Sequence, residues 1–124
     1  MTKRILVVEV QEDLRAILRD FLKASGYDVV EAVDGGEGVA QAQSKRPDLI
    51  LMDIQLPVLD GYEATRRIKA DPSLKSTPII AVSSYAMKGD EEKARASGCD
   101  DYVTKPYSPI QLLRIIRGLL GEPA

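Results

Sequence analysis

The chain has 124 residues, of which 44% are hydrophobic and 29% charged, a composition typical of one folded domain rather than a disordered segment. Its 17 basic and 19 acidic residues leave a net charge of −2, so we expect no nucleic-acid binding through a basic face. The absence of histidine excludes Ser/His and Cys/His nucleophile pairs and histidine-liganded zinc, and a single cysteine excludes an internal disulfide.

Short apolar runs rich in β-branched residues alternate with stretches of helical periodicity. The predicted strands are residues 5–8, 27–30, 49–52, 79–82 and 102–104. A first helix is indicated by apolar residues spaced three and four apart, which are Leu14, Ile17, Leu18, Phe21 and Leu22. Further helices are predicted at 37–44, 62–70 and 88–96. The last helix begins at Ser108-Pro109, and its predicted buried face is Ile110, Leu113, Ile116 and Leu120.

The alternation of strands and helices predicts the fold class. Strands joined through helices form a parallel sheet with right-handed crossovers. Repeated across this chain, the pattern predicts an α/β fold of flavodoxin-like type, a doubly wound five-stranded parallel sheet in the order 2-1-3-4-5 with five helices. The first and third strands are then neighbours. Glu9 and Asp53, which follow those two strands, should therefore lie close together.

Three chemically distinctive residues follow the first, third and fifth predicted strands. Glu9 comes directly after residues 5–8, Asp53 after 49–52, and Lys105 after 102–104. The carboxyl ends of parallel strands meet at one edge of the sheet, where open α/β folds place their chemistry. An acid, an aspartate and a lysine gathered there suggest a carboxylate that accepts a phosphoryl group.

Several segments carry a resemblance to a known family. They are residues 5–9, 51–57, 60–61, 81–84 and 102–106. Together they resemble the receiver domain of two-component response regulators, and the similarity extends over residues 1–124 as one domain. Single-domain regulators of the cell-cycle and chemotaxis type are the most similar. The resemblance implies a signalling protein in a phosphorelay and not an enzyme.

The resemblance also implies roles for residues at the strand ends. Asp53 would be the phosphoacceptor, and its carboxylate would become an acyl phosphate. Lys105 would pair with a phosphoryl oxygen as a point charge, and Ser83 would donate its hydroxyl to the same group. Ser84 is a weaker candidate, through its backbone N–H. The Lys105-Pro106 peptide bond would be cis, which aims the lysine into the site.

A Mg²⁺ ion is the cofactor that the family uses, and one expected ligand is missing. The implied ligands are Glu9, commonly through water, the Asp53 carboxylate and the backbone carbonyl of Gln55. A second acid is expected at position 10, where this chain has Val10. An isopropyl group cannot bind a cation, and its presence removes one negative charge, so Mg²⁺ binding should be weak. Glu12 is a nearby substitute but should begin a helix and point away.

Three explanations of Val10 remain open from the sequence. It is a substitution introduced to impair metal binding, or natural drift toward a receiver that signals without phosphorylation. Alternatively, the chain is still phosphorylated with weak dependence on metal.

The resemblance also implies a conformational switch and protein partners. Ser83 and Tyr102 would move together on phosphorylation and alter a surface that includes Lys88, Lys93, Tyr102 and Tyr107. Tyr85, close to the phosphoryl site, would slow hydrolysis of the acyl phosphate. The phosphoryl donor would be a histidine kinase or histidine phosphotransfer protein, and a downstream effector protein would bind the switched surface. Leu14, Arg15 and Leu18 would contact the donor, although the two leucines also fit a purely structural place in the core.

Other functions of the same fold class fit the sequence less well. An FMN carrier needs a hydroxyl-rich or glycine-rich phosphate loop after the first strand, an aspartate phosphatase needs an acid at position 55, and a nucleotide hydrolase needs a Gly-Lys-Ser/Thr loop. The chief alternative is a receiver-like interaction module that works without phosphorylation. No apolar run reaches the ~18 residues that cross a membrane and none resembles a signal peptide, so we expect a cytoplasmic protein without membrane contact.

Overall fold

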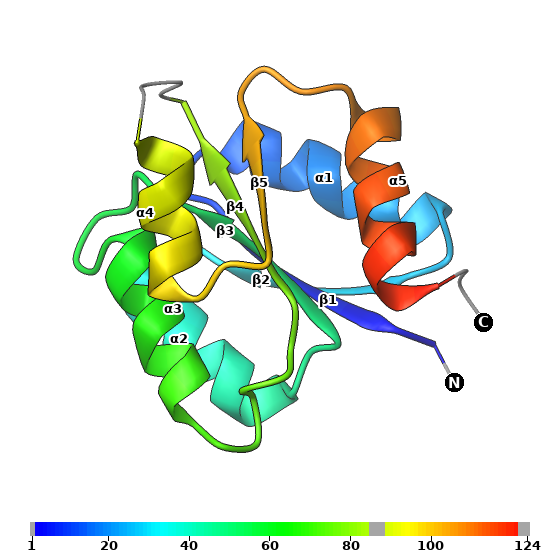
Figure 1. The fold of residues 1–124 in the computed structure, drawn as a ribbon. Helices are drawn as coiled ribbons and strands as arrows, with labels where there is room; N and C mark the ends of the chain where they lie inside the picture. The colour runs from blue at the N-terminus through cyan, green and yellow to red at the C-terminus, as the bar shows by residue number, and fades with distance from the viewer. Residues whose placement is uncertain (1, 85–88, 122–124) are drawn as a thin grey trace.

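The computed structural model describes residues 2–84 and 89–121, which form one parallel sheet flanked by helices (Figure 1). The strands are β1 (Arg4–Val8), β2 (Asp28–Ala32), β3 (Leu49–Asp53), β4 (Ile79–Ser83) and β5 (Asp101–Thr104). The helices are α1 (Glu12–Ala24), α2 (Gly35–Lys45), α3 (Gly61–Ala70), α4 (Asp90–Ser97) and α5 (Pro109–Leu120). The sheet order is β2-β1-β3-β4-β5, which confirms the predicted fold.

The alternation of side chains along the strands divides the core into two layers. Leu49 and Leu51 of β3 pack with buried residues of α1 and α5, whereas Ile50 and Met52 pack with those of α3. Figure 1 shows α1 and α5 on one face of the sheet and α2, α3 and α4 on the other. Every residue of β3 is buried, as expected for a strand covered on both faces.

Two residues on the apolar helical faces that the spacing indicated are exposed. Ile17 of α1 has 59% of its surface exposed, and Ile110 of α5 has 61%. Helix α1 faces the sheet through Leu18 and Leu22, and α5 does so through Leu112 and Ile116, one residue away from the face expected at Leu113. The three-and-four spacing identifies a broad apolar stripe, but only the packing of the helix decides which edge of that stripe is covered.

Helix α2 begins two residues before the predicted start because Asp34 caps it. The Asp34 carboxylate accepts a hydrogen bond from the N–H of Glu37 at 2.7 Å, so Gly35 and Gly36 belong to the first helical turn rather than to a preceding turn. Gly35 is required by packing, since a β-carbon there would overlap the backbone carbonyl of Leu59. The loop before α3 therefore lies directly against the start of α2.

Two further helices, α3 and α5, begin with a side-chain cap. Asp60 caps α3 by accepting from the N–H of Glu63 at 2.9 Å, and Ser108 caps α5, whose first residue is Pro109. Helix α4 is preceded by Gly89 and starts at Asp90, whereas residue 88, where its start was predicted, lies outside the described residues. Among the described helices, none has the length and apolar character of a membrane-spanning segment.

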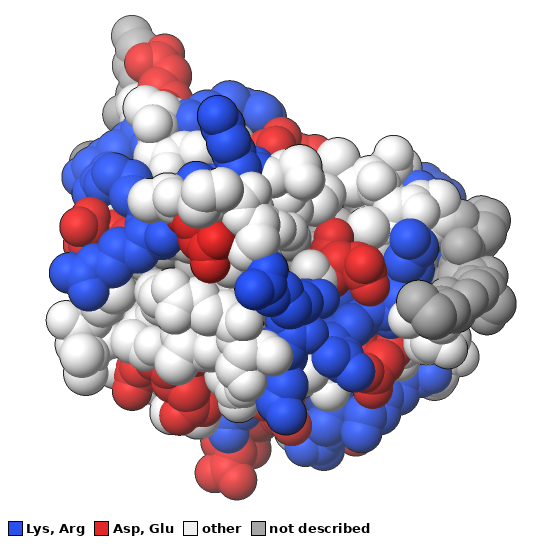
Figure 2. All heavy atoms as spheres, turned by 90° about the horizontal axis from the view of Figure 1, so that it is seen from below, with Lys and Arg blue, Asp and Glu red and all other residues white. Residues whose placement is uncertain are grey.

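Charged residues are spread over the surface. Figure 2 views the molecule from below, and on that face Lys and Arg side chains are bordered by acidic and uncharged ones. Several charged residues of the molecule form ion pairs between elements, such as Arg4 with Asp28 and Lys69 with Asp100. The pattern fits the near balance of acidic and basic residues in the composition.

Candidate functional site

The polar residues predicted to meet at the strand ends do so. Asp53 and Ser83 end β3 and β4, Glu9 follows β1, and Lys105 follows β5. The register pairs Asp53 with Val82 and Ser83 with Thr104, which brings the strand ends level with one another. Glu9 and Asp53 are each 3% exposed and Ser83 is 1% exposed, so the site is built from buried polar groups.

Lys105 joins the two buried carboxylates. Its Nζ lies 2.8 Å from Oε1 of Glu9 and 3.3 Å from Oδ2 of Asp53. The lysine is held by its own backbone, because its N–H donates to the carbonyl of Ser83 at 2.7 Å. The Lys105–Pro106 peptide bond is cis. One ammonium group therefore partly neutralises two anions that water does not reach.

The electrostatics of the site favour protonation of Asp53. Burial raises the pKa of its carboxyl, and so do the hydrogen bond and negative charge of Glu9. The charge of Lys105 and the N–H of Gln55 act in the opposite direction, and the resulting pKa is about 6. Burial lowers the pKa of Lys105, but its contacts with Glu9 and Asp53 outweigh this and raise it above the ordinary value. Lys105 therefore stays charged when Asp53 ionises.

Gln55 contacts three parts of the site. Its backbone N–H donates to Oδ1 of Asp53 at 3.0 Å. Its side-chain Nε2 lies 3.1 Å from Oγ of Ser83, and its Oε1 accepts from the N–H of Ser84 at 2.9 Å. The family resemblance implied a role only for the backbone carbonyl of Gln55, as a metal ligand. The side-chain contacts bridge two loops that lie far apart in the sequence, and no local pattern predicts them.

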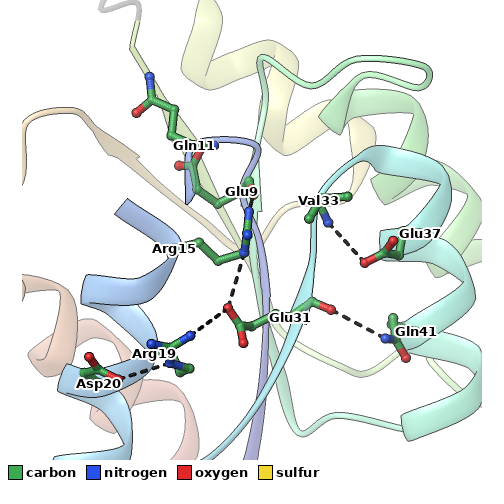
Figure 3. A network of polar contacts seen from close by, with 9 residues as sticks. All are labelled: Glu9, Gln11, Arg15, Arg19, Asp20, Glu31, Val33, Glu37 and Gln41. Carbon is green, nitrogen blue, oxygen red and sulfur yellow. Dashed lines mark hydrogen bonds and ion pairs between the residues drawn. The ribbon is translucent and has the colours of Figure 1, made fainter. Parts of the chain in front are cut away.

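Glu9 is positioned by a network that extends to the edge of the sheet (Figure 3). Its Oε2 accepts from the N–H of Gln11 at 3.0 Å, and its carbonyl accepts from Nη1 of Arg15 at 2.9 Å. Arg15 also pairs with Glu31 of β2 at 3.3 Å, and Arg19 approaches the same carboxylate at 3.6 Å. Arg15, predicted to contact a donor protein, thus has only 15% of its side chain exposed and takes part in the site's support.

Comparison with known proteins identifies the family. The model of the response regulator receiver domain matches residues 5–117. The chain belongs to this family. It is therefore a signalling module of two-component phosphorelays rather than a classical enzyme, and a receiver works with a histidine kinase as its partner.

Relatives of known identity are similar over nearly the whole receiver. The polar-differentiation response regulator DivK of Brucella ovis is 43% identical over 98% of this chain and 99% of that protein. The receiver domain of sensor histidine kinase PA1611 from Pseudomonas aeruginosa is 38% identical, with a TM-score of 0.90. The match covers 98% of this chain and 100% of that one, and the crystal structure of that domain has a magnesium ion in its active-site cleft. Chemotaxis protein CheY4 of Vibrio cholerae is 28% identical with a TM-score of 0.91, over 96% and 99% of the two chains.

The ligand set for a cation is incomplete in this receiver. Glu9 and Asp53 supply carboxylates, but the side chain of Val10 has no ligand atom and Val10 is 43% exposed. Glu12, the possible substitute, is an exposed residue in the first turn of α1. Within residues 2–84 and 89–121, no cluster of three or more His, Cys, Asp or Glu residues could hold a metal ion. The residues present therefore fit Mg²⁺ only in part.

Aromatic residues near the receiver's site differ in their surroundings. Tyr102 of β5 is half-buried and packs against the core layer beneath α3 and α4. Tyr107, which was predicted to belong to the same switched surface, is half-buried, with its hydroxyl buried and its ring packed against the core layer of α1 and α5. Burial and the charges of Glu9 and Asp53 raise the pKa of Tyr107, so its hydroxyl stays protonated. Tyr85 and Lys88 lie outside the described residues.

An apolar groove of about 550 Å³ opens beside the receiver's site. Its walls come from α1 and from the segment between β5 and α5, and its lining residues are Leu14, Ile17, Leu18, Ser84, Lys105, Pro106, Tyr107 and Pro109. Leu18 is buried and Leu14 half-buried, so both also contribute to the core. Ile17 is 59% exposed and forms part of the groove's wall.

Proposed function

We propose that residues 1–124 act as a receiver domain whose Asp53 accepts a phosphoryl group from a histidine of a kinase or phosphotransfer protein. The observation that carries the proposal is the placement of the Lys105 ammonium between the buried carboxylates of Glu9 and Asp53. An Oδ atom of Asp53 attacks phosphorus, the bond from phosphorus to the histidine nitrogen breaks, and the imidazole leaves. The product is an acyl phosphate on Asp53.

Two side chains at the strand ends are suited to hold the transferred group. Lys105 supplies a fixed positive charge for a phosphoryl oxygen, and charge development on these oxygens is what phosphoryl transfer must stabilise. Ser83, at the end of the neighbouring strand, supplies a hydroxyl that can donate to another oxygen. Both side chains are already placed by backbone contacts, since the N–H of Lys105 bonds to the carbonyl of Ser83.

Magnesium binding in this chain is weak in our proposal. Glu9, Asp53 and the carbonyl of Gln55 would hold the ion, which when bound neutralises phosphoryl oxygens. The aliphatic side chain of Val10 removes one anionic ligand, and the ammonium of Lys105 already lies against both remaining carboxylates. Lys105 therefore neutralises a larger share of the charge on the phosphoryl oxygens here than it would in a receiver whose complete acidic cluster binds Mg²⁺ tightly.

The apolar groove beside the site is the surface that we assign to the phosphoryl donor. Its exposed wall includes Ile17 and Pro109, and Lys105 is also among its lining residues. An amphipathic helix is the element that fills such a groove, with apolar side chains on one face. A histidine carried on that helix would approach Asp53 past Lys105.

Output from the receiver is proposed to pass through Ser83 and Tyr102 to an effector protein. Strands β4 and β5 are paired, with Ala81 opposite Tyr102 and Ser83 opposite Thr104. A movement of Ser83 would therefore act directly on the strand that carries Tyr102. Helix α4 borders this strand, and its Lys93 lies over the ring of Tyr62 at 4.8 Å. We place this signalling in the cytoplasm, where two-component relays that use receivers of this type operate.

The test is phosphorylation by acetyl phosphate with and without Mg²⁺, followed by intact mass. Three proteins are compared, the parent chain, Val10→Asp and Asp53→Ala. An adduct of one phosphoryl group that disappears in Asp53→Ala supports the proposal. An adduct seen only with Val10→Asp would identify the missing acid as the reason that the parent is inactive. The absence of an adduct in both the parent and Val10→Asp would exclude Asp53 as an acceptor.

A second function, that of an interaction module independent of phosphorylation, is favoured by two observations. The site lacks the acid at position 10, and Lys105 is already paired with both carboxylates before any phosphoryl group arrives. Equal binding of the effector by the parent chain and by the Asp53→Ala variant would support this second function.

A further inference from the structure

The side chain of Gln55 joins the connection after β3 to the end of β4, beside the proposed phosphoryl site. Gln55 lies in the connection after β3, and it contacts Ser83 and Ser84 at the end of β4, which are 28 and 29 residues away in the sequence. The contacts measure 3.1 Å to Oγ of Ser83 and 2.9 Å to the N–H of Ser84. The same residue holds Oδ1 of Asp53 through its backbone N–H.

The chemistry of the partners fixes the direction of both side-chain bonds. A backbone N–H can only donate, so the amide oxygen of Gln55 must face Ser84. The amide nitrogen then faces Ser83, whose oxygen accepts. The opposite orientation of the amide would set its NH₂ group against the N–H of Ser84.

We infer that the amide oxygen of Gln55 stands in for a phosphoryl oxygen in the resting receiver and must release the N–H of Ser84 when Asp53 is phosphorylated. The inference rests on the proposed function of Asp53. A phosphoryl group presents only acceptor oxygens and needs donors around it. The single proton of the Ser84 N–H cannot serve Gln55 and a phosphoryl oxygen together.

Ser83 is restrained rather than blocked by the same contact. Its hydroxyl oxygen can accept from Gln55 while its proton is donated elsewhere. The two bonds together fix the distance between the end of β4 and the loop after β3, and any approach of Ser83 toward Asp53 strains them. Bonds to an ionised phosphoryl group are roughly twice as strong as neutral ones, so the exchange is favourable only after transfer. Gln55 thus holds the unphosphorylated arrangement.

The test compares Gln55→Met, which keeps the length of the side chain without its polar atoms, with the parent. Rates of phosphorylation by acetyl phosphate are measured by intact mass, in the parent background and in Val10→Asp. Gln55→Met is expected to react about three- to tenfold faster, the factor that one ordinary hydrogen bond is worth. The matched control is Gln43→Met, at an exposed position of α2, which should leave the rate unchanged.

A third variant separates release from a general loosening of the loop. Gln55→Glu keeps an acceptor for the N–H of Ser84, so it is expected to react no faster than the parent. A general loosening of the loop after β3 would instead accelerate both Gln55→Met and Gln55→Glu. If folded Gln55→Met reacts no faster than the parent, the inference about Gln55 is overturned, whereas the proposed function of Asp53 is unaffected. The absence of an adduct in every background would remove the proposed function, and the inference with it.

Discussion

The ammonium of Lys105 lies 2.8 Å from Glu9, closer than the 3.3 Å that separates it from Asp53. The lysine thus makes its shorter contact with the supporting acid and its longer one with the proposed acceptor. This arrangement leaves the Asp53 carboxylate only partly neutralised, in agreement with its pKa of about 6. The pair that positions the lysine also controls how readily the acceptor ionises.

Replacement of Glu9 by Gln is expected to lower the pKa of Asp53 from about 6 toward the ordinary value of 3.8. A neighbouring negative charge disfavours ionisation, so its removal favours the carboxylate, and Lys105 becomes free to turn fully to Asp53. Titration of the Asp53 carboxyl carbon by NMR measures this shift. A pKa that stays at 6 or rises in the variant would show that burial alone sets the value.

Asp53→Asn is expected to stabilise the fold at pH 8 by about 1–3 kcal/mol. The carboxyl binds its proton more tightly in the folded state than in the unfolded one, because its pKa is about 6 rather than 3.8. Stability of the parent therefore falls as the pH rises from about 4 to 6 and stays lower above that range. The variant lacks this loss, so its advantage should disappear near pH 4.

Urea unfolding at pH 8 and pH 4 checks the preceding prediction. Glu92→Gln on the exposed surface of α4 is the control for removal of an acidic charge. A variant that is less stable than the parent at pH 8 would mean that the pair with Lys105 outweighs the cost of burying the Asp53 anion.

Val10→Asp is expected to raise the affinity for Mg²⁺ by about 10–100-fold or more, since it restores an anionic ligand to the site. Isothermal titration calorimetry on the unphosphorylated protein gives the affinity without any phosphoryl transfer. Val33→Asp is the matched control, because Val33 is 40% exposed against 43% for Val10 and follows the neighbouring strand β2. Equal gains in the two variants would show that added surface charge, not ligation, attracts the ion.

Gly35→Ala is expected to destabilise the protein by about 1–3 kcal/mol, the usual cost of overpacking. The added methyl group would overlap the backbone carbonyl of Leu59, and backbone cannot move aside as a flexible side chain does. Gly36→Ala is the neighbouring control, since the nearest atom there is Oδ1 of Asp34 at 3.5 Å, an ordinary contact. Thermal unfolding of both variants decides the matter, and equal losses would contradict the packing argument.

Ile17→Glu is expected to slow phosphoryl transfer from a histidine donor protein at least tenfold, while transfer from acetyl phosphate stays unchanged. A carboxylate on the wall of the groove disfavours burial against an apolar helix, whereas a small donor does not use the groove. Ile110→Glu is a close control, because Ile110 is equally exposed, at 61% against 59%, but does not line the groove. Slowing of both donors would instead indicate damage to the site.

The sequence predicted the sheet order and the meeting of Glu9, Asp53 and Lys105, because strand ends in a parallel sheet must share an edge. It did not predict the side chain of Gln55 across to Ser84, or Arg15 reaching from α1 to Glu31. Those contacts depend on loop paths and rotamers, which periodicity does not encode. The exposure of Ile17 and Ile110 was missed for a related reason, since helical spacing gives a stripe but not the neighbour that covers it.

The network of Arg15 ties together three parts of the chain, which are the carbonyl of Glu9, helix α1 and Glu31 on β2 (Figure 3). Strand β2 lies at the edge of the sheet, paired only with β1 among the described strands. Edges and their neighbouring loops are common starting points for local opening. Because the edge strand is fastened to the loop that holds Glu9, fraying of β2 would disturb that acid before the central strands separate. Amide exchange along β2 should therefore report on the integrity of a site two strands away.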